Sequence, residues 1–224
     1  MTRPWQTLAT VSTPEGPLEL RQRGDGDGAD FLIVVGGRVL MTSAARRSEE
    51  LLARLACERL AGRSAPRVLV GGLGMGYTLR AALDALPSDA AVVVAELNPD
   101  VVTWCRGPLA AASGGALADP RVTVDIADVA KTIAAAPAGR YDAIVLDLYE
   151  GPHAATQRRD DPFYAPGALS RQRAALAAGG VLAVWSEEAD AAYERRLTAA
   201  GFEVSIHREG RGGRTHVVYL GVRG

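Results

Sequence analysis

Short, continuously apolar runs recur along the last two thirds of the chain, and an amphipathic or helix-starting stretch follows each of the first four. The runs cover residues 67–72, 90–96, 121–126, 141–147 and 180–186. The intervening stretches predict helices over about 77–86, from about 99, from about 127 and over about 165–178. Apolar strands that alternate with helices are typical of a parallel sheet covered on both faces.

The chain closes with two further strand patterns after an amphipathic stretch at 190–201. Residues 202–208 and 215–222 are joined by a glycine-rich, hairpin-like loop, so one of these strands is expected to be antiparallel to its neighbour. Together the runs predict an α/β fold, with a Rossmann-like, mainly parallel sheet of seven strands.

The first forty residues have a different pattern, in which short strands are separated by tight turns. Residues 17–23, 31–35 and 38–41 read as a small antiparallel β meander, and a helix is expected from near Ser43. The Asp/Gly segment at 23–30 lacks the remaining ligands of an EF-hand loop and is interpreted as a hairpin turn. We therefore predict an N-terminal β-strand domain over 1–44 and a Rossmann-like domain over 45–224.

Composition narrows the class of protein. The 224 residues carry a net charge of −1, which favours neither a nucleic acid nor a membrane as partner. The two cysteines lack CxxC spacing, the N-terminus lacks a signal-peptide pattern, and no apolar run is long enough to span a bilayer. These features predict a cytoplasmic protein. The three histidines show no metal-ligand spacing, so no metal is expected.

Candidate chemistry lies at the predicted strand ends, where open α/β sheets bind their ligands. The first strand runs into Gly71–Gly76, and glycines let a ligand approach the backbone closely. Glu96 ends the second strand, 20 positions after Gly76, where a carboxylate is placed to accept hydrogen bonds from ribose hydroxyls. The alternatives are a glycine turn that merely packs and an acid that caps the next helix.

Two more strand ends carry acids. Asp128 follows the third strand and could either accept from an adenine amine or cap the next helix. The fourth strand ends at Asp147, and Tyr149 and Glu150 follow within three positions. Neither acid is needed to fold a strand. Further along, His153 and Trp185 could line the same pocket; His207 and His216, on strands, are interpreted as structural.

At these residues the chain resembles the spermidine synthase (polyamine aminopropyltransferase) family, which has the fold of class I S-adenosylmethionine-dependent methyltransferases. The resemblance is carried by RVLVGGLGMGYTLRAAL at 67–83, VVVAELNPDVV at 92–102, PRVTVDIADV at 120–129, YDAIVLDLYEGP at 141–152, and the stretch 161–187. It implies that the donor lies across the glycine loop and that Asp147 anchors or deprotonates the attacking amine, with Tyr149 and Glu150 shaping the acceptor pocket. The cofactor-binding set it implies is Gly72, Gly74, Met75, Gly76, Glu96, Leu97, Asp128, Val129 and Asp147.

The chain departs from the family pattern at three places. Met75 stands where the family loop carries the Asp that holds the aminopropyl ammonium, Tyr77 replaces a glycine, and Glu150 is followed by an additional Gly151. A neutral Met75 cannot pair with an ammonium. This favours S-adenosylmethionine as donor, with its decarboxylated form as the other candidate.

The predicted function is transfer of a methyl or aminopropyl group from an S-adenosyl sulfonium donor to a small-molecule, amine acceptor. The resemblance also implies a homodimer. Two alternatives stand beside it: a non-catalytic or divergent member that binds adenosyl ligands, and an NAD-dependent oxidoreductase. The second is disfavoured because the loop lacks the full GxGxxG fingerprint.

Overall fold

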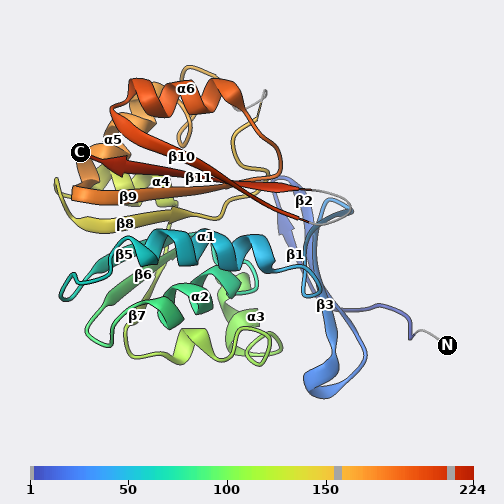
Figure 1. The fold of residues 1–224 in the computed structure, drawn as a ribbon. Coiled ribbons are helices and arrows are strands. Elements are labelled where there is room, and N and C mark those ends of the chain that lie inside the picture. The colour runs from blue at the N-terminus through green and yellow to red at the C-terminus, as the bar shows by residue number, and fades with distance from the viewer. Residues whose placement is uncertain (1–2, 154–157, 211–214) are drawn as a thin grey trace.

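The computed structural model contains two β-sheets, one small and one large (Figure 1). It describes residues 3–153, 158–210 and 215–224. The large sheet has seven strands in the order β10-β11-β9-β8-β5-β6-β7, which confirms the predicted strand number. Its strands are β5 (Arg67–Gly71), β6 (Ala91–Glu96), β7 (Val122–Ile126), β8 (Tyr141–Leu146), β9 (Leu176–Ser186), β10 (Phe202–Glu209) and β11 (His216–Arg223).

Strand β5 lies at the point where the strand order reverses. It pairs in parallel with β6 on one side and with β8 on the other. At one edge, β11 is antiparallel to both β9 and β10, as the hairpin-like loop predicted. In such a sheet the loops after the two strands at the switch point diverge and leave a crevice at their carboxyl ends.

Helices cover both faces of the large sheet, and each face has its own apolar core (Figure 1). Alternate residues of one strand point to opposite faces, so Val68 and Val70 enter one cluster and Leu69 the other. Within the described residues, no helix is long and apolar enough to cross a membrane. The helices are α1 (Arg47–Glu58), α2 (Tyr77–Ala85), α3 (Pro99–Arg106), α4 (Val129–Ala135), α5 (Pro166–Ala175) and α6 (Ala191–Ala199).

The small sheet is an antiparallel meander of β1 (Gln6–Thr13), β2 (Gly16–Arg23), β3 (Asp30–Val35) and β4 (Arg38–Thr42). The sequence predicted only the last three strands. Strand β1 was missed because it is a largely exposed edge strand rich in threonine and serine, with no apolar alternation strong enough to identify it. The predicted Asp/Gly hairpin turn joins β2 to β3, whereas α1 begins at Arg47 and not near Ser43.

A β-bulge in the hairpin of β3 and β4 places the side chains of Arg38 and Met41 on the same face of β4. Met41 pairs with Ile33 while Val39 already pairs with Val34, so Leu40 is the extra residue of the bulge. Arg38 pairs with Val35. Because Ile33 and Val35 lie on one face of β3, their partners Met41 and Arg38 lie on the same face of β4.

That face of the small sheet packs on the large unit. Leu20 and Ile33 belong to the same apolar cluster as Leu52 of α1, and Met41 packs against that cluster. Because one apolar core runs through both parts, the domain boundary between residues 44 and 45 stays a prediction.

The carboxyl ends of β5 and β8 approach so closely that only glycine fits between them. Gly72 has a φ of +86°, and an added Cβ would lie 2.4 Å from the carbonyl oxygen of Asp147. Gly62, in the turn after α1, has a nearly identical φ of +85°, but a Cβ there would meet nothing within 4 Å. The two positions therefore separate backbone strain from steric overlap.

We predict that Gly72→Ala costs substantially more stability than Gly62→Ala. In Gly62→Ala the only cost is the strain of an alanine in the left-handed backbone conformation, which lowers stability by about 1–2 kcal/mol. Gly72→Ala adds an overlap with backbone atoms, worth about 1–3 kcal/mol more. Urea unfolding of the two variants and the wild-type protein measures the difference. Equal losses would show that the contact between Gly72 and Asp147 is not a constraint on the fold.

Candidate active site

The glycine loop Gly72–Gly76 lies at the switch point, between β5 and α2. Its first amide, that of Gly72, donates to the carbonyl of Ala95 at 3.0 Å, which ties the loop to β6. Gly76 has a φ of +82° and precedes the first residue of α2. The loop is therefore held against its two neighbouring strands, as a ligand-binding turn at this place requires.

Glu96 is buried beneath the glycine loop. One carboxylate oxygen accepts from the amide of Leu73 and the other from the amide of Asn98, each at 2.8 Å. Burial raises the pKa of Glu96, and these hydrogen bonds oppose that rise. The next helix is capped by the side chain of Asn98, so Glu96 is a loop-binding carboxylate and not a surface cap. The backbone of Leu97 also donates to Glu96, and a carboxylate offers about four acceptor positions, so about one remains for another donor.

The ends of β6 and β7 expose apolar side chains beside Asp128. Leu97 is 73% exposed and Ile126 is 50% exposed. Asp128 caps α4 by accepting from the amide of Ala130 at 2.8 Å, so the helix-cap interpretation of this residue holds. Val129 is buried and can reach a ligand only through its backbone. Ile126 was missed, although an isoleucine at the exposed end of a strand was a usable signal.

Asp147 follows β8 and lies across from the start of α2. Its carboxylate accepts from the hydroxyl of Thr78 at 2.5 Å. Burial, and next the negative charge of Glu49, raise the pKa of Asp147 to about 7, while the Thr78 hydrogen bond lowers it. Among the described residues, no ion pair to Asp147 within 4 Å is found. A carboxyl group with such a pKa can both hold and release a proton near neutral pH.

Glu49 comes from the first turn of α1 and is itself buried. The hydroxyl of Ser48 donates to its carboxylate at 2.7 Å, and the Nδ1 atom of His216 lies 3.0 Å from that hydroxyl. The ring of Trp185, at the end of β9, lies 5.0 Å from the ring of His216. A place for Trp185 in the acceptor pocket stays a prediction, and His216, interpreted as structural, contacts the serine that donates to Glu49.

Tyr149 and Glu150 lie further out than Asp147. Tyr149 is 46% exposed, and burial raises the pKa of its hydroxyl. The Glu150 carboxylate contacts Arg38 of β4 and the Nε2 atom of His153, the latter at 2.9 Å. Arg38 also lies 5.1 Å from the centre of the Tyr149 ring. The predicted catalytic residues therefore separate into an inner Asp147 and an outer pair.

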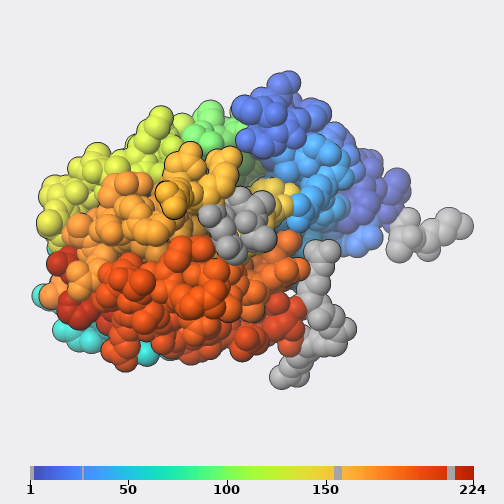
Figure 2. All heavy atoms as spheres, turned by 90° about the horizontal axis from the view of Figure 1, so that it is seen from above, coloured from blue at the N-terminus to red at the C-terminus, as the bar shows by residue number. Residues whose placement is uncertain are grey.

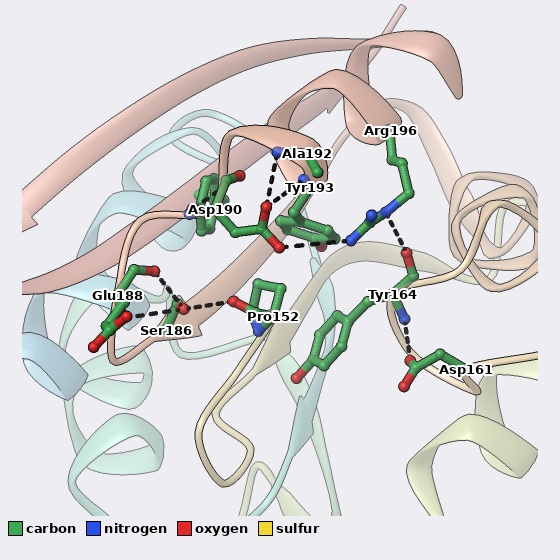
Figure 3. Close-up of polar contacts among 10 residues, drawn as sticks. Pro152, Asp161, Tyr164, Ser186, Glu188, Asp190, Ala192, Tyr193 and Arg196 are labelled. Carbon is green, nitrogen blue, oxygen red and sulfur yellow. Dashed lines mark hydrogen bonds and ion pairs between the residues drawn. The ribbon is translucent and has the colours of Figure 1, made fainter. Parts of the chain in front are cut away.

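The described parts of the segment between β8 and α5 are hydrogen-bonded to the end of β9 and to α6 (Figure 3). The hydroxyl of Ser186 donates to the carbonyls of Pro152 and Glu188. Beyond the undescribed residues 154–157, Arg196 donates to the carbonyl of Tyr164 at 3.1 Å. Burial, and next the negative charges of Asp161 and Asp147, raise the pKa of the Tyr164 hydroxyl.

Proteins of known structure share this architecture. No protein-family model matches the chain. A spermidine synthase from Thermotoga maritima superposes with a TM-score of 0.77 at 19% identity, covering 98% of this chain and 73% of that one. A probable spermidine synthase from Corynebacterium glutamicum gives 0.70 at 15% identity, covering 97% and 79%. Human methyltransferase-like protein 13 in complex with SAH gives 0.58 at 21% identity, covering 78% and 81%.

The chain has the spermidine synthase fold. In sequence it is similar to putrescine N-methyltransferase 1 from Nicotiana tabacum, at 35% identity over 123 residues. Putrescine N-methyltransferase 1 from Nicotiana attenuata gives the same identity over the same length. The matched segment is 54% of this chain but only 30% of the tobacco protein, so the chain spans less than a third of the length of these curated relatives.

The spermidine synthase fold brings together the glycine loop, Glu96 and Asp147; Asp128 follows β7, which is separated from β8 by the two strands β5 and β6. Met75 is fully buried, so its backbone is the part that a ligand can contact. Sequence reasoning missed Thr78, Glu49 and Arg38. Thr78 and Glu49 act on Asp147 from helices that precede it by 69 and 98 positions, and no local pattern marks such partners.

We predict opposite effects on Asp147 from two conservative changes. Glu49→Gln removes a neighbouring negative charge and lowers the pKa of Asp147; Thr78→Val removes a hydrogen bond to the charged form and raises it. Carboxyl-carbon NMR titration of Asp147 measures both. A pKa that moves in the same direction in the two variants would contradict this account of the site.

The raised pKa of Asp147 also determines how the free energy of unfolding depends on pH. The folded-state pKa of about 7 exceeds the ordinary value of 3.8, so the folded state binds the proton more tightly. The contribution of Asp147 to stability is complete below pH 4 and is lost as the pH rises toward 7.

Proposed function

We propose that this protein transfers an alkyl group from an S-adenosyl sulfonium donor to the amine of a small molecule. One observation supports the proposal: at one sheet edge, a glycine loop is hydrogen-bonded to the buried Glu96, and the partly buried Asp147 lies directly beside that loop. We further propose that it works in the cytoplasm as a homodimer, without a metal, nucleic acid or membrane partner. Within residues 3–153, 158–210 and 215–224, no cluster of three or more potential metal ligands is found.

The residues at the ends of β5, β6 and β7 fit the adenosine part of such a donor. Glu96 has about one acceptor position left for a ribose hydroxyl, and Asp128 keeps carboxylate lone pairs for the adenine amine. Leu97 and Ile126 offer exposed apolar surface that a planar base would cover. When bound, the donor supplies an electrophilic carbon that already carries its leaving group.

Asp147 is suited to the acceptor amine because of its raised pKa. A free amine has a pKa near 10 and arrives as an ammonium, so it must lose a proton before it can attack. A carboxylate with a pKa of about 7 holds that proton far better than one with the ordinary value of 3.8. Glu49 adds a second buried negative charge that favours the ammonium on arrival. Alignment of the amine by these acids contributes the positional part of catalysis.

The donor favoured here is S-adenosylmethionine. Discrimination for the decarboxylated form would need a carboxylate in the glycine loop to pair with its ammonium, and Met75 provides none. The names of the putrescine N-methyltransferases agree with methyl transfer to an amine. Their length leaves most of each relative without a counterpart in this chain.

We predict that the wild-type protein binds S-adenosylmethionine more tightly than its decarboxylated form. Isothermal titration with both compounds, and with 5′-methylthioadenosine as a reference that lacks the amino-acid part, measures the preference. Tighter binding of the decarboxylated donor would assign the protein to aminopropyl transfer instead. Failure of all three to bind would reject the nucleoside site.

We predict that Asp147→Asn loses turnover and retains donor binding. Asparagine keeps an acceptor for Thr78 but cannot take a proton from the amine, so turnover should fall by about 10²–10⁴-fold. Asp125→Asn is the matched control, because Asp125 is an exposed acid near the end of β7. Turnover with amine acceptors and calorimetric donor binding are measured on both variants. Unchanged turnover in Asp147→Asn rejects its role.

A further inference from the structure

Two carboxylates outside Asp147 form an outer acidic site, defined here as Glu150 and Glu187. Both contact one guanidinium from the small sheet: one terminal nitrogen of Arg38 contacts Glu150, and the other lies 3.3 Å from Glu187. The guanidinium also lies against the ring of Tyr149. In Figure 2 the blue atoms of the small sheet lie against the yellow atoms of the segment that follows β8. A positive charge from the protein itself therefore fills the outer acidic site.

The backbone holds the outer acidic site in place independently of Arg38. Glu150 has a φ of +62°, a conformation that side-chain-bearing residues adopt at a cost. A Cβ on the next residue, Gly151, would lie 2.3 Å from the carbonyl oxygen of Trp185, so this loop is pressed onto the end of β9. The amide of Glu187 donates to the carbonyl of Glu150 at 3.1 Å. The two carboxylates are thus a preformed place for a cation.

The position of Arg38 is also built into the fold. The bulge at Leu40 turns Arg38 and Met41 to the same face of β4. The sulfur of Met41 lies 3.3 Å from the amide nitrogen of Met75 and would lie 2.9 Å from a Cβ on Gly74. Strand β4 therefore packs on the glycine loop through Met41. This contact fixes the position of Arg38 beside Glu150 and Glu187.

We propose that Arg38 is a specificity-determining residue that occupies the outer acidic site, so that the acceptor carries a single ammonium, held at Asp147, and an uncharged far end. The inference rests on the proposed function. A second ammonium on the acceptor would have to displace the guanidinium from two carboxylates and an aromatic ring, or lie beside a like charge. An uncharged end meets neither obstacle.

The test compares acceptors that differ only in their second charge. The diamines 1,3-diaminopropane, 1,4-diaminobutane and 1,5-diaminopentane are paired with the primary monoamines of the same chain length, with S-adenosylmethionine as donor. The proteins are the wild type, Arg38→Gln, Arg38→Lys and the control Arg21→Gln, whose arginine pairs with Glu19 on the same small sheet. The measured quantity is the ratio of kcat/KM for each diamine to that for its monoamine.

The wild type is expected to favour the monoamine. Arg38→Gln is expected to raise the diamine-to-monoamine ratio about five- to tenfold, because it removes a like charge and leaves the carboxylates of Glu150 and Glu187 without the guanidinium. Arg38→Lys, which keeps the charge, and Arg21→Gln are expected to leave the ratio near the wild-type value. A purely structural role for Arg38 would lower both activities together and leave the ratio unchanged.

Two results overturn the proposal: an unchanged ratio in Arg38→Gln that retains its melting temperature, or a wild type that favours diamines and loses that preference in Arg38→Gln. Calorimetric binding of the same amines to protein saturated with 5′-methylthioadenosine gives the ratio without turnover. If the amines bind with the expected ratio but none is alkylated, the proposed function fails and the specificity inference stands. If no amine binds, both fail.

Discussion

The close approach of β5 and β8 at their carboxyl ends is the constraint on which the site depends. An added Cβ at Gly72 would lie 2.4 Å from the carbonyl oxygen of Asp147, and the left-handed backbone disfavours a side chain there as well. This close approach puts the glycine loop and Asp147 side by side. A bulkier residue would push the two strand ends apart and separate the surfaces proposed for donor and acceptor.

The electrostatics of the inner site follow from that packing. The hydroxyl of Thr78 offsets only part of the cost of burying the Asp147 charge. Burial is unfavourable for the charged form of a carboxyl group, and together with the charge of Glu49 it raises the pKa of Asp147. Carboxyl groups with strongly raised pKa values are common at ligand-binding sites. At the proposed site, an incoming ammonium would stabilise the charged form of Asp147.

The small N-terminal sheet participates in both halves of the site through one strand. Met41 of β4 contacts the glycine loop, and Arg38 of the same strand contacts the loop after β8. The bulge at Leu40 makes this possible, because without the additional residue the two side chains would point to opposite faces. The sheet is thus part of the site as well as of the apolar core.

The sequence by itself determined the elements whose signal is local. Apolar runs marked the strands of the large sheet, the glycines marked the turn at Gly72–Gly76, and strand-end acids marked Glu96 and Asp147, because periodicity and strand ends are readable over a few residues. Tertiary structure decided the rest. It placed Glu49 near Asp147 from 98 positions away and Arg38 on Glu150 from 112 positions away, and it buried Met75. It also added the exposed edge strand β1 and shifted the start of α1. Such contacts depend on strand order, a one-residue bulge and the packing of one sheet on another, and none of these leaves a pattern within a single stretch of chain.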